Sequence, residues 1–180
     1  VDFKDSNIVS LDLGGGRRPI KGEYDLIMND RVDDVKSASD YSYTHKFVDL
    51  ETLQDNDPFG YVAQLVGYAV AAGKKVGGWW VVNKANGQHK YVSAKHVDVE
   101  AVLDKIRETY DYLENDEPLQ RQYTDEPETY RKQTTGNRVL CRECNFCSFK
   151  RSCWPDYQEL PSKTYQGRKT PPTVSYTQIA

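Results

Sequence analysis

Two aspartates and a lysine in the first quarter of the chain have the residue types and spacing that phosphodiester hydrolysis requires. Asp25 lies on one predicted strand, and Asp34 and Lys36 lie two residues apart on the next. Side chains two apart on a strand share a face, so Asp34 and Lys36 project together and Asp33 projects oppositely. Two carboxylates are typical ligands of Mg²⁺. The lysine is placed to orient or deprotonate the attacking water, or to stabilise the negative charge that develops on the phosphate. The stretch predicts half of a metal site, against the alternative of a solvated strand face.

A second set of candidate ligands is the group Cys141, Cys144, Cys147 and Cys153, which includes every cysteine of the chain. A disulfide framework normally spreads its bridges across the fold to close loops. Tight clustering without an export signal instead indicates metal ligation in a reducing compartment. The spacing C-x2-C-x2-C-x5-C suits tetrahedral Zn²⁺ or an iron–sulfur cluster, and thiolate softness alone does not choose between them. We expect the ligated group to pin the C-terminal segment as a structural staple.

Short strands must position the two aspartates. Turn signals at Asn29–Asp30 and Asn86–Gly87 predict two hairpins. Alternating or β-rich segments predict strands at 7–13, 22–28, 31–37, 79–84 and 89–94.

Two helices complete the predicted core. Asp57 as N-cap and Pro58 at the first helical position predict one start, and Gly73 closes that helix. Asp98 caps a second helix, whose apolar side chains form one stripe over 99–113. The order β-β-β-α-β-β-α, followed by a cysteine module, predicts a mixed sheet flanked by helices, in the α/β class.

Composition predicts three parts of the chain. Residues 1–115 contain the periodic elements and are the predicted core. Residues 116–155 are expected to be a linker and the cysteine-cluster module. Residues 156–180 are rich in Pro, Thr, Lys and Tyr and are expected to be a polar tail, poorly ordered or docked.

Three motifs follow one another in the first part. Residues 22–25 read G-x-x-D, residues 34–36 read D-x-K, and Gln64 and Tyr68 lie four apart on one helix face as Q-x-x-x-Y. In this order they resemble the motifs of the PD-(D/E)XK nuclease superfamily, specifically its RecB-like exonucleases. Each motif alone is weak evidence for the family, because such short patterns also occur by chance. The resemblance depends on all three motifs occurring in this order.

This resemblance implies a restriction-endonuclease-like fold and a Mg²⁺- or Mn²⁺-dependent deoxyribonuclease that acts as an exonuclease in recombination, repair or phage DNA metabolism. It implies that Asp25 and Asp34, with the Val35 carbonyl, hold the ion. Lys36 would orient or deprotonate the water, or stabilise the developing charge. Gln64 and Tyr68 would place the DNA.

The family usually adds an acidic or histidine ligand from a helix ahead of the first strand. The acids available here are Asp2, Asp5 and Asp12, and none lies on a convincing helix. Because the chain begins at Val1 rather than at Met, we expect either that an upstream segment supplies this ligand or that another group replaces it.

The triplet Cys144, Cys147 and Cys153 resembles the C-terminal cysteines of iron–sulfur RecB-like nucleases. Those enzymes normally take a fourth cysteine from ahead of the nuclease motifs, and the only further cysteine here is Cys141. The resemblance favours a [4Fe–4S] cluster, with Zn²⁺ as the alternative.

Basic and aromatic side chains surround the cysteines. The basic ones are candidates for contacts with a DNA backbone, namely Arg138, Arg142, Lys150 and Arg151. Phe146, Phe149 and Trp154 are candidates for base stacking, or for packing around the metal group, which is the favoured reading for Trp154.

The composition of the chain argues against several other classes of protein. The 180-residue chain has a formal charge of −3 and 38% hydrophobic residues, which argues against a broadly basic nucleic-acid wrapper but not against a local basic groove. No apolar run approaches the roughly 18 residues of a membrane span, and the sequence as given shows no signal-peptide pattern. We expect a cytoplasmic protein of a bacterial or phage-infected cell. Its expected partner is DNA, with a helicase, a recombinase or a second copy as protein partner. The alternative function is a non-catalytic nucleic-acid-binding module with a zinc-bound cysteine knob.

Overall fold

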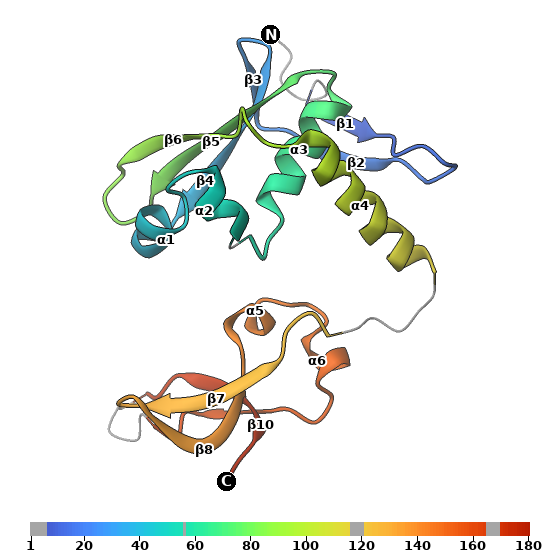
Figure 1. Ribbon diagram of the computed structural model, residues 1–180. Helices are drawn as coiled ribbons and strands as arrows, with labels where there is room; N and C mark the ends of the chain where they lie inside the picture. Colours follow the sequence, from blue (N-terminus) through green and yellow to red (C-terminus); the bar gives the residue numbers. More distant parts are fainter. Residues whose placement is uncertain (1–6, 56, 116–120, 165–169) are drawn as a thin grey trace. The chain divides into compact units, whose positions relative to one another are not determined.

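The computed structural model describes residues 7–55, 57–115, 121–164 and 170–180 (Figure 1). The chain divides into two compact units, residues 1–117 and residues 118–180. Both contain helices and sheet, and the predicted α/β class is confirmed. No helix in the described ranges has the length and apolar character that a membrane crossing requires.

The first unit contains two sheets. A two-stranded antiparallel sheet consists of β1 (Ile8–Leu11) and β2 (Ile20–Glu23). A four-stranded sheet consists, in spatial order, of β3 (Leu26–Met28), β4 (Arg31–Ala38), β5 (Lys75–Asn83) and β6 (His89–Ser93). Strands β4 and β5 are parallel and the other neighbours are antiparallel, so this sheet is mixed.

Helices connect and cover these strands. A parallel pair of strands needs a crossover connection, and three helices lie between β4 and β5 in the chain. They are α1 (Asp40–His45), α2 (Leu50–Asp55) and α3 (Tyr61–Ala71). Helix α4 (Val99–Glu114) follows β6 and begins at the predicted cap, where the Asp98 carboxylate accepts a hydrogen bond from Ala101 N–H at 3.1 Å. The two short helices α1 and α2 were not predicted from the sequence.

Three predicted boundaries in this unit were wrong, and one of them is the start of β5, which lies at Lys75 rather than at residue 79. The expected strand 22–28 is divided, because β2 pairs with β1 whereas β3 pairs with β4, and Asp25 lies between the two. Helix α3 begins at Tyr61, later than its predicted start. The N-cap is Gly60 rather than the predicted Asp57, although the Asp57 carboxylate still accepts hydrogen bonds from the N–H groups of Tyr61 (2.9 Å) and Val62 (2.8 Å). It reaches them across a turn that ends at Gly60, whose φ is 68°.

Helix α3 is the centre of the first unit, where it contacts α4, β1, β4 and β5 (Figure 1). Its buried side chains Leu65 and Ala69 pack in one core cluster with the buried Trp79 of β5. Val66, on another side of the helix, packs in a second cluster with residues of β1 and α4. The helix is therefore held from two directions, and the residues on its remaining face are positioned by this packing.

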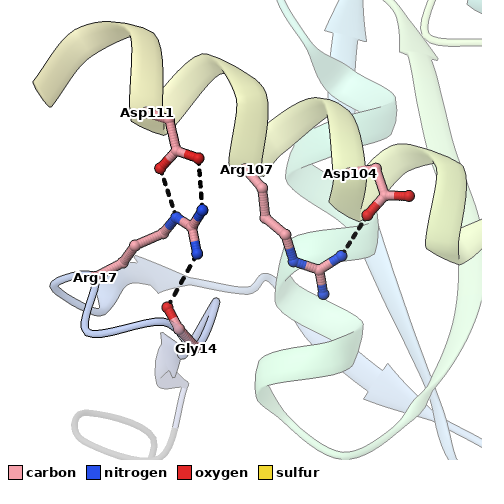
Figure 2. A network of polar contacts seen from close by, with 5 residues as sticks. All are labelled: Gly14, Arg17, Asp104, Arg107 and Asp111. Carbon is pink, nitrogen blue, oxygen red and sulfur yellow. Dashed lines mark hydrogen bonds and ion pairs between the residues drawn. The ribbon is translucent and has the colours of Figure 1, made fainter. Parts of the chain in front are cut away.

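The loop between β1 and β2 is tied to α4, as Figure 2 shows. The Arg17 guanidinium donates to both carboxylate oxygens of Asp111, with Nε 2.6 Å from Oδ1, and to the Gly14 carbonyl at 3.2 Å. Arg107 pairs with Asp104 along the same helix. Gly14 has a φ of 70°, and its N–H donates to the Asp12 carboxylate. Of these contacts, the Arg17–Asp111 pair joins the loop to α4, and the others lie within the loop or within the helix.

The second unit is a four-stranded antiparallel sheet with two short helices. Its strands, in spatial order, are β7 (Asp125–Tyr130), β8 (Gln133–Leu140), β10 (Thr173–Gln178) and β9 (Gln158–Pro161). Its helices are α5 (Arg142–Asn145) and α6 (Lys150–Cys153).

The predictions of a linker with the cysteine module at 116–155 and of a poorly ordered or docked polar tail at 156–180 did not include the strands that both ranges contain. Strands β7 and β8 lie in the first range, and β9 and β10 lie in the second. A buried polar network holds β10 in this sheet. Glu128 accepts hydrogen bonds from Asn137 (2.7 Å), Thr135 (2.9 Å) and the Tyr176 hydroxyl (2.9 Å). Burial raises the pKa of Glu128, but these hydrogen bonds outweigh it and the pKa is lowered. Tyr176 is 1% exposed, so β10 supplies core material.

Candidate metal-dependent active site

The two predicted carboxylates converge beside β4. Asp25 lies in the break between β2 and β3, and its Oδ2 accepts a hydrogen bond of 2.6 Å from the backbone N–H of Val35. Asp34 precedes Val35 and is 3% exposed. The Lys36 Nζ lies 2.7 Å from Asp34 Oδ2. The hydrogen bond across the sheet edge therefore brings Asp25 to the part of β4 that carries Asp34 and Lys36.

The environment of Asp34 disfavours the ionised form of its carboxyl group. Burial raises the pKa of its carboxyl group; Lys36 opposes this rise, and the nearby Asp25 carboxylate adds to it. Asp34 Oδ2 is buried and has no hydrogen bond of acceptable geometry, although it forms the ion pair with Lys36. A buried acceptor of this kind carries a desolvation cost. A metal ion bound between Asp25 and Asp34 would relieve the repulsion between their carboxylates.

This donor set fits a magnesium or manganese ion. Mg²⁺ is usually held in enzymes by one or two carboxylates together with waters and substrate phosphates, rather than by a complete protein cage. Asp25 and Asp34 meet that requirement. Among the described residues, no group of three or more His, Cys, Asp or Glu side chains is close enough to hold a metal, so the candidate set here consists of the two carboxylates alone.

A chain of polar contacts extends from the carboxylates to α3. Lys36 Nζ donates to Gln64 Oε1 at 2.9 Å, and Gln64 Nε2 donates to the Tyr68 hydroxyl at 3.2 Å. The structure thus brings together Asp25, Asp34, Lys36, Gln64 and Tyr68, five side chains predicted from three separate motifs. Val35 takes part through its N–H; its side chain is 45% exposed.

Gly22 has a packing role in this arrangement. A Cβ atom at Gly22 would lie 2.4 Å from Cε1 of the Tyr68 ring and 3.2 Å from Cδ1. Carbon atoms do not approach this closely, so any side chain at position 22 displaces the ring. The glycine of the G-x-x-D motif is therefore required because the tyrosine of the Q-x-x-x-Y motif packs on it.

If the chain has the deoxyribonuclease activity that the resemblance implies, we expect Gly22→Ala to lower it by about ten- to a hundredfold, because a small displacement of a group that places the substrate has effects of that size. The measurement is kcat/KM on linear DNA, with a thermal melt to show that the fold is retained. Gly67→Ala is the matched control on α3, since its Cβ would lie 3.6 Å from the nearest atom, in Leu11. Equal activity of Gly22→Ala and the parent would contradict this role.

Asp33 has a different function from its neighbour. Its carboxylate accepts hydrogen bonds from Gly78 N–H (2.9 Å), Trp80 Nε1 (3.3 Å) and the Tyr91 hydroxyl (2.8 Å). Burial and then the contact with Asp33 raise the pKa of Tyr91 to about 12. The pairing of β4 with β5 shifts register between Val32 and Asp34. Asp33 therefore fastens β4 to β5 and β6 at the position from which Asp34 projects.

Tyr61 is a component of the site that the sequence interpretation missed. The Lys36 Nζ lies 5.1 Å from the centre of the Tyr61 ring, in a cation–π contact. Burial raises the pKa of the Tyr61 hydroxyl, and Lys36 opposes this rise. The available signal was helical spacing, because Tyr61, Gln64 and Tyr68 recur on one face of α3.

The other predicted acids do not complete the metal site. The Asp12 carboxylate accepts a hydrogen bond from Gly14 N–H at 2.8 Å in the loop between β1 and β2. Asp2 and Asp5 lie outside the described residues.

The structure brings two of the four cysteines into direct contact. Cys141 precedes α5, Cys144 lies within it, and their Sγ atoms are 3.5 Å apart. Two thiolates on one tetrahedral zinc ion lie about 3.8 Å apart, given a Zn–S bond of about 2.3 Å. Burial raises the pKa of Cys144 to about 12, and Cys141, Cys147 and Cys153 each add to the rise. The Cys141–Cys144 separation is compatible with two ligands of one metal ion, but among the described residues no group of three or more ligands is close enough to hold a metal.

Packing around the cysteines separates the aromatic candidates. Trp154 packs against the cluster of Leu140, Cys141 and Cys144, as its favoured interpretation predicted. Phe146 and Phe149 are 67% and 59% exposed.

The basic candidates of the second unit differ in their partners. Arg138 pairs with Asp125 at 2.6 Å, and Arg138 followed by Thr177 lowers the pKa of Asp125 to about 2. Lys150 pairs with Glu159 at 2.7 Å. Because their charges are compensated, these two are weak candidates for DNA contacts. Arg142 is exposed, and Arg151 lies over the Tyr157 ring.

Comparison of the chain with protein-family models, with curated proteins and with solved structures found no match. The function is therefore argued from the geometry of the two sites.

Proposed function

We propose that the first unit is a metal-dependent deoxyribonuclease of the PD-(D/E)XK type, similar to RecB-like exonucleases, that degrades linear DNA. The observation that carries the proposal is the continuous chain of contacts from Asp34 through Lys36 and Gln64 to Tyr68. These residues come from β4 and α3, which are separated in sequence by α1 and α2. A solvated strand face would not bury Asp34 or connect its lysine to a helix.

The arrangement of elements supports the same proposal. Asp25 and Asp34 flank an antiparallel hairpin, β4 pairs with the parallel strand β5, and α3 covers the sheet with Gln64 and Tyr68 beside the carboxylates. This arrangement supports the proposal of a restriction-endonuclease-like fold for the first unit.

In this proposal Asp25 and Asp34, with the Val35 carbonyl, hold Mg²⁺ or Mn²⁺. The bound ion supplies Lewis acidity, which polarises a phosphoryl oxygen and lowers the pKa of a water.

Lys36 contributes a fixed positive charge beside the reacting group. Its ammonium is held by Asp34, by Gln64 and by the face of Tyr61, so it does not need to reorganise when negative charge develops on the phosphate. Gln64 and Tyr68 lie at the far end of the same series of hydrogen bonds. In this proposal their polar groups bind and position the DNA backbone.

We also propose that the four cysteines hold a metal group that stabilises the second unit. The proposal is supported by the chemistry of the four side chains, because thiolates are soft ligands that bind zinc and iron–sulfur clusters. The short distance between Cys141 and Cys144 favours Zn²⁺ over the [4Fe–4S] cluster, because cysteines of a cluster bind separate irons.

The test of the nuclease proposal combines activity and metal binding. We expect Mg²⁺ or Mn²⁺ to support degradation of linear DNA and EDTA to abolish it. Lys36→Met should lower turnover by about a hundredfold or more, because one preorganised charge contact is removed. The same variant should keep the rise in melting temperature that Mn²⁺ produces, because both carboxylates remain.

Two results would contradict this assignment. Parental protein that leaves linear DNA intact with either ion is the result expected of the non-catalytic binding module. Loss of Mn²⁺ stabilisation in Lys36→Met, with normal turnover at saturating metal, would assign the lysine to the metal site alone.

A further inference from the structure

Four basic side chains line a cavity at the end of the four-stranded sheet where β4 and β5 begin. Arg31 is the first residue of β4, Lys74 and Lys75 lie at the junction of α3 and β5, and Lys95 follows β6. The cavity has a volume of about 340 Å³, which lies within the range of small-molecule sites. Among the described residues, no acidic side chain lines it. We call it the basic cavity.

Backbone contacts hold the basic residues in place. Arg31 and Lys75 are partners in the register of the parallel strands β4 and β5. The Lys75 N–H also donates to the Asp30 carbonyl at 3.1 Å. Directly ahead of Lys95, the Ala94 N–H donates to a carbonyl of β5 at 2.8 Å. A ligand of the cavity therefore does not have to order these segments first.

The positive charges of the basic cavity are only partly compensated. The Lys74 Nζ lies 2.8 Å from Asp30 Oδ1. Among the described residues, no hydrogen bond or ion pair is formed by the other three side chains, those of Arg31, Lys75 and Lys95. Arg31 and Lys75 act only electrostatically, on Tyr91 and on Asp30. Three such cations around one cavity repel one another, and an anion with several negative charges would relieve that repulsion.

Apolar side chains form the rest of the cavity wall. They come from α3, from β5 and from the segment in which α4 begins, and they are Val70, Val76, Val97 and Val99. An inorganic anion gains nothing from such a surface, whereas an organic group attached to the anion would bury apolar area against it. The lining therefore indicates a ligand with an anionic part and an organic part.

We infer that the basic cavity binds a small organic polyphosphate, with its phosphates among Arg31, Lys75 and Lys95 and its organic group against the valines. Lysine and arginine bind phosphate oxygens through charge-assisted hydrogen bonds, and arginine can donate two of them in parallel. A triphosphate has enough negative charge to compensate all three cations. The inference goes beyond the proposed nuclease function and does not depend on it, because the cavity shares no residue with the carboxylate site.

Calorimetric titration of the full chain in EDTA tests the inference without hydrolysis. The probes are adenosine triphosphate, inorganic tripolyphosphate and adenosine monophosphate. We expect adenosine triphosphate to bind most tightly, because it presents both a triphosphate and an organic group. Adenosine monophosphate should bind at least about tenfold more weakly, because it lacks two of the three phosphates and their charge-assisted hydrogen bonds.

Single substitutions separate the charges from the apolar wall. Arg31→Gln and Lys95→Gln should each weaken binding of both triphosphates by about tenfold, because each removes a charged donor. Lys84→Gln is the matched control, since Lys84 is exposed in the turn between β5 and β6 and does not line the cavity. Val70→Ala should weaken binding of adenosine triphosphate by about threefold and leave tripolyphosphate unchanged. Val70 is 37% exposed, so this variant retains the fold.

A gain of affinity excludes misfolding as the cause of these effects. Asp30→Asn removes the partner of Lys74 and so adds a fourth uncompensated cation to the cavity. Asp30 has a φ of 62°, which asparagine tolerates, so the turn is retained. We expect this variant to bind tripolyphosphate about fivefold more tightly than the parent does.

Four outcomes would overturn the inference. They are parental protein that binds neither triphosphate, equal losses in Lys84→Gln and Lys95→Gln, weaker binding of tripolyphosphate by Asp30→Asn, and equal affinities of the parent for the two adenosine nucleotides. Parental protein that binds a blunt DNA duplex through Lys95 but no triphosphate would also overturn it, and would assign the cavity to a nucleic-acid backbone. The nuclease proposal is judged separately, by Mg²⁺-dependent degradation of linear DNA.

Discussion

Asp34→Asn is expected to reduce Mg²⁺-dependent degradation of linear DNA by about a thousandfold or more without destabilising the protein. The substitution removes one of two carboxylates from the proposed ion site, and the ion supplies several kcal/mol of stabilisation to the transition state. Rates would be measured at saturating metal, and binding of Mn²⁺ would be followed by the shift in melting temperature. Degradation at the parental rate would exclude Asp34 from the site.

The expected stability of this variant follows from the raised pKa of Asp34. The unfolded chain releases the Asp34 proton more readily than the folded chain. The free energy of unfolding therefore falls as pH rises from the ordinary pKa of 3.8 toward the raised value of the folded state. At neutral pH the ionised group opposes folding. Asparagine removes that charge, so we expect the melting temperature at pH 7 to stay equal or to rise.

Asp33→Asn is the matched control, because it makes the same change in the adjacent residue. Asp33 is 2% exposed and accepts three hydrogen bonds, from Gly78, Trp80 and Tyr91. An amide can accept through only one oxygen, so part of this network is lost. We expect a loss of about 3 kcal/mol in the free energy of unfolding. If both variants lost stability equally, the division between a binding carboxylate and a structural carboxylate would be wrong.

Cys144→Ser is expected to have the largest effect on the second unit. Cys144 is 7% exposed and packs with Leu140 and Cys141 in a small core. Structural zinc sites in small peptides contribute apparent free energies of about 10 kcal/mol or more, which is comparable to the whole stability of a domain. Loss of the metal group should therefore unfold much of this unit, whereas the first unit retains its own core.

Elemental analysis and thermal melting would test this prediction. The parental protein should contain either one zinc or stoichiometric iron with sulfide, and Cys144→Ser should contain neither and should lose the melting transition of the second unit. Ser148→Ala is the control, because Ser148 is exposed and lies in the same segment. This variant should retain the metal and the stability of the parental protein. Metal-free parental protein that melts like Cys144→Ser would reject the metal group. Brown protein with iron and sulfide would identify it as the cluster.

Local spacing was sufficient to predict several features of the first unit. The hairpin turn at Asn29–Asp30 was predicted from residue type, and both residues have positive φ in the structure. The Asp98 cap and the shared helix face of Gln64 and Tyr68 were predicted in the same way. Each of these depends on a few neighbouring residues, whose side chains compete for the same backbone groups or recur with the helical period.

Features that depend on distant partners were missed. The strand predicted at 22–28 is divided because its two halves pair with different strands, β1 and β4. The polar segment after residue 155 forms β9 and β10 because Tyr176 reaches the Glu128 carboxylate, far away in sequence. A single strand has no stability of its own, so its existence depends on a partner that local pattern does not identify.

The candidate site shows the same division. Residue type and spacing were enough to select the carboxylates, the lysine and the helix residues as a chemical set, because the donors that a metal and a phosphate require are few. Only the tertiary structure decided that Val35 N–H holds Asp25, that burial raises the pKa of Asp34, and that Tyr68 packs on Gly22. Burial, close packing and electrostatic strain arise between segments that the chain brings together from far apart, and for that reason they are properties of the fold rather than of any local stretch of sequence.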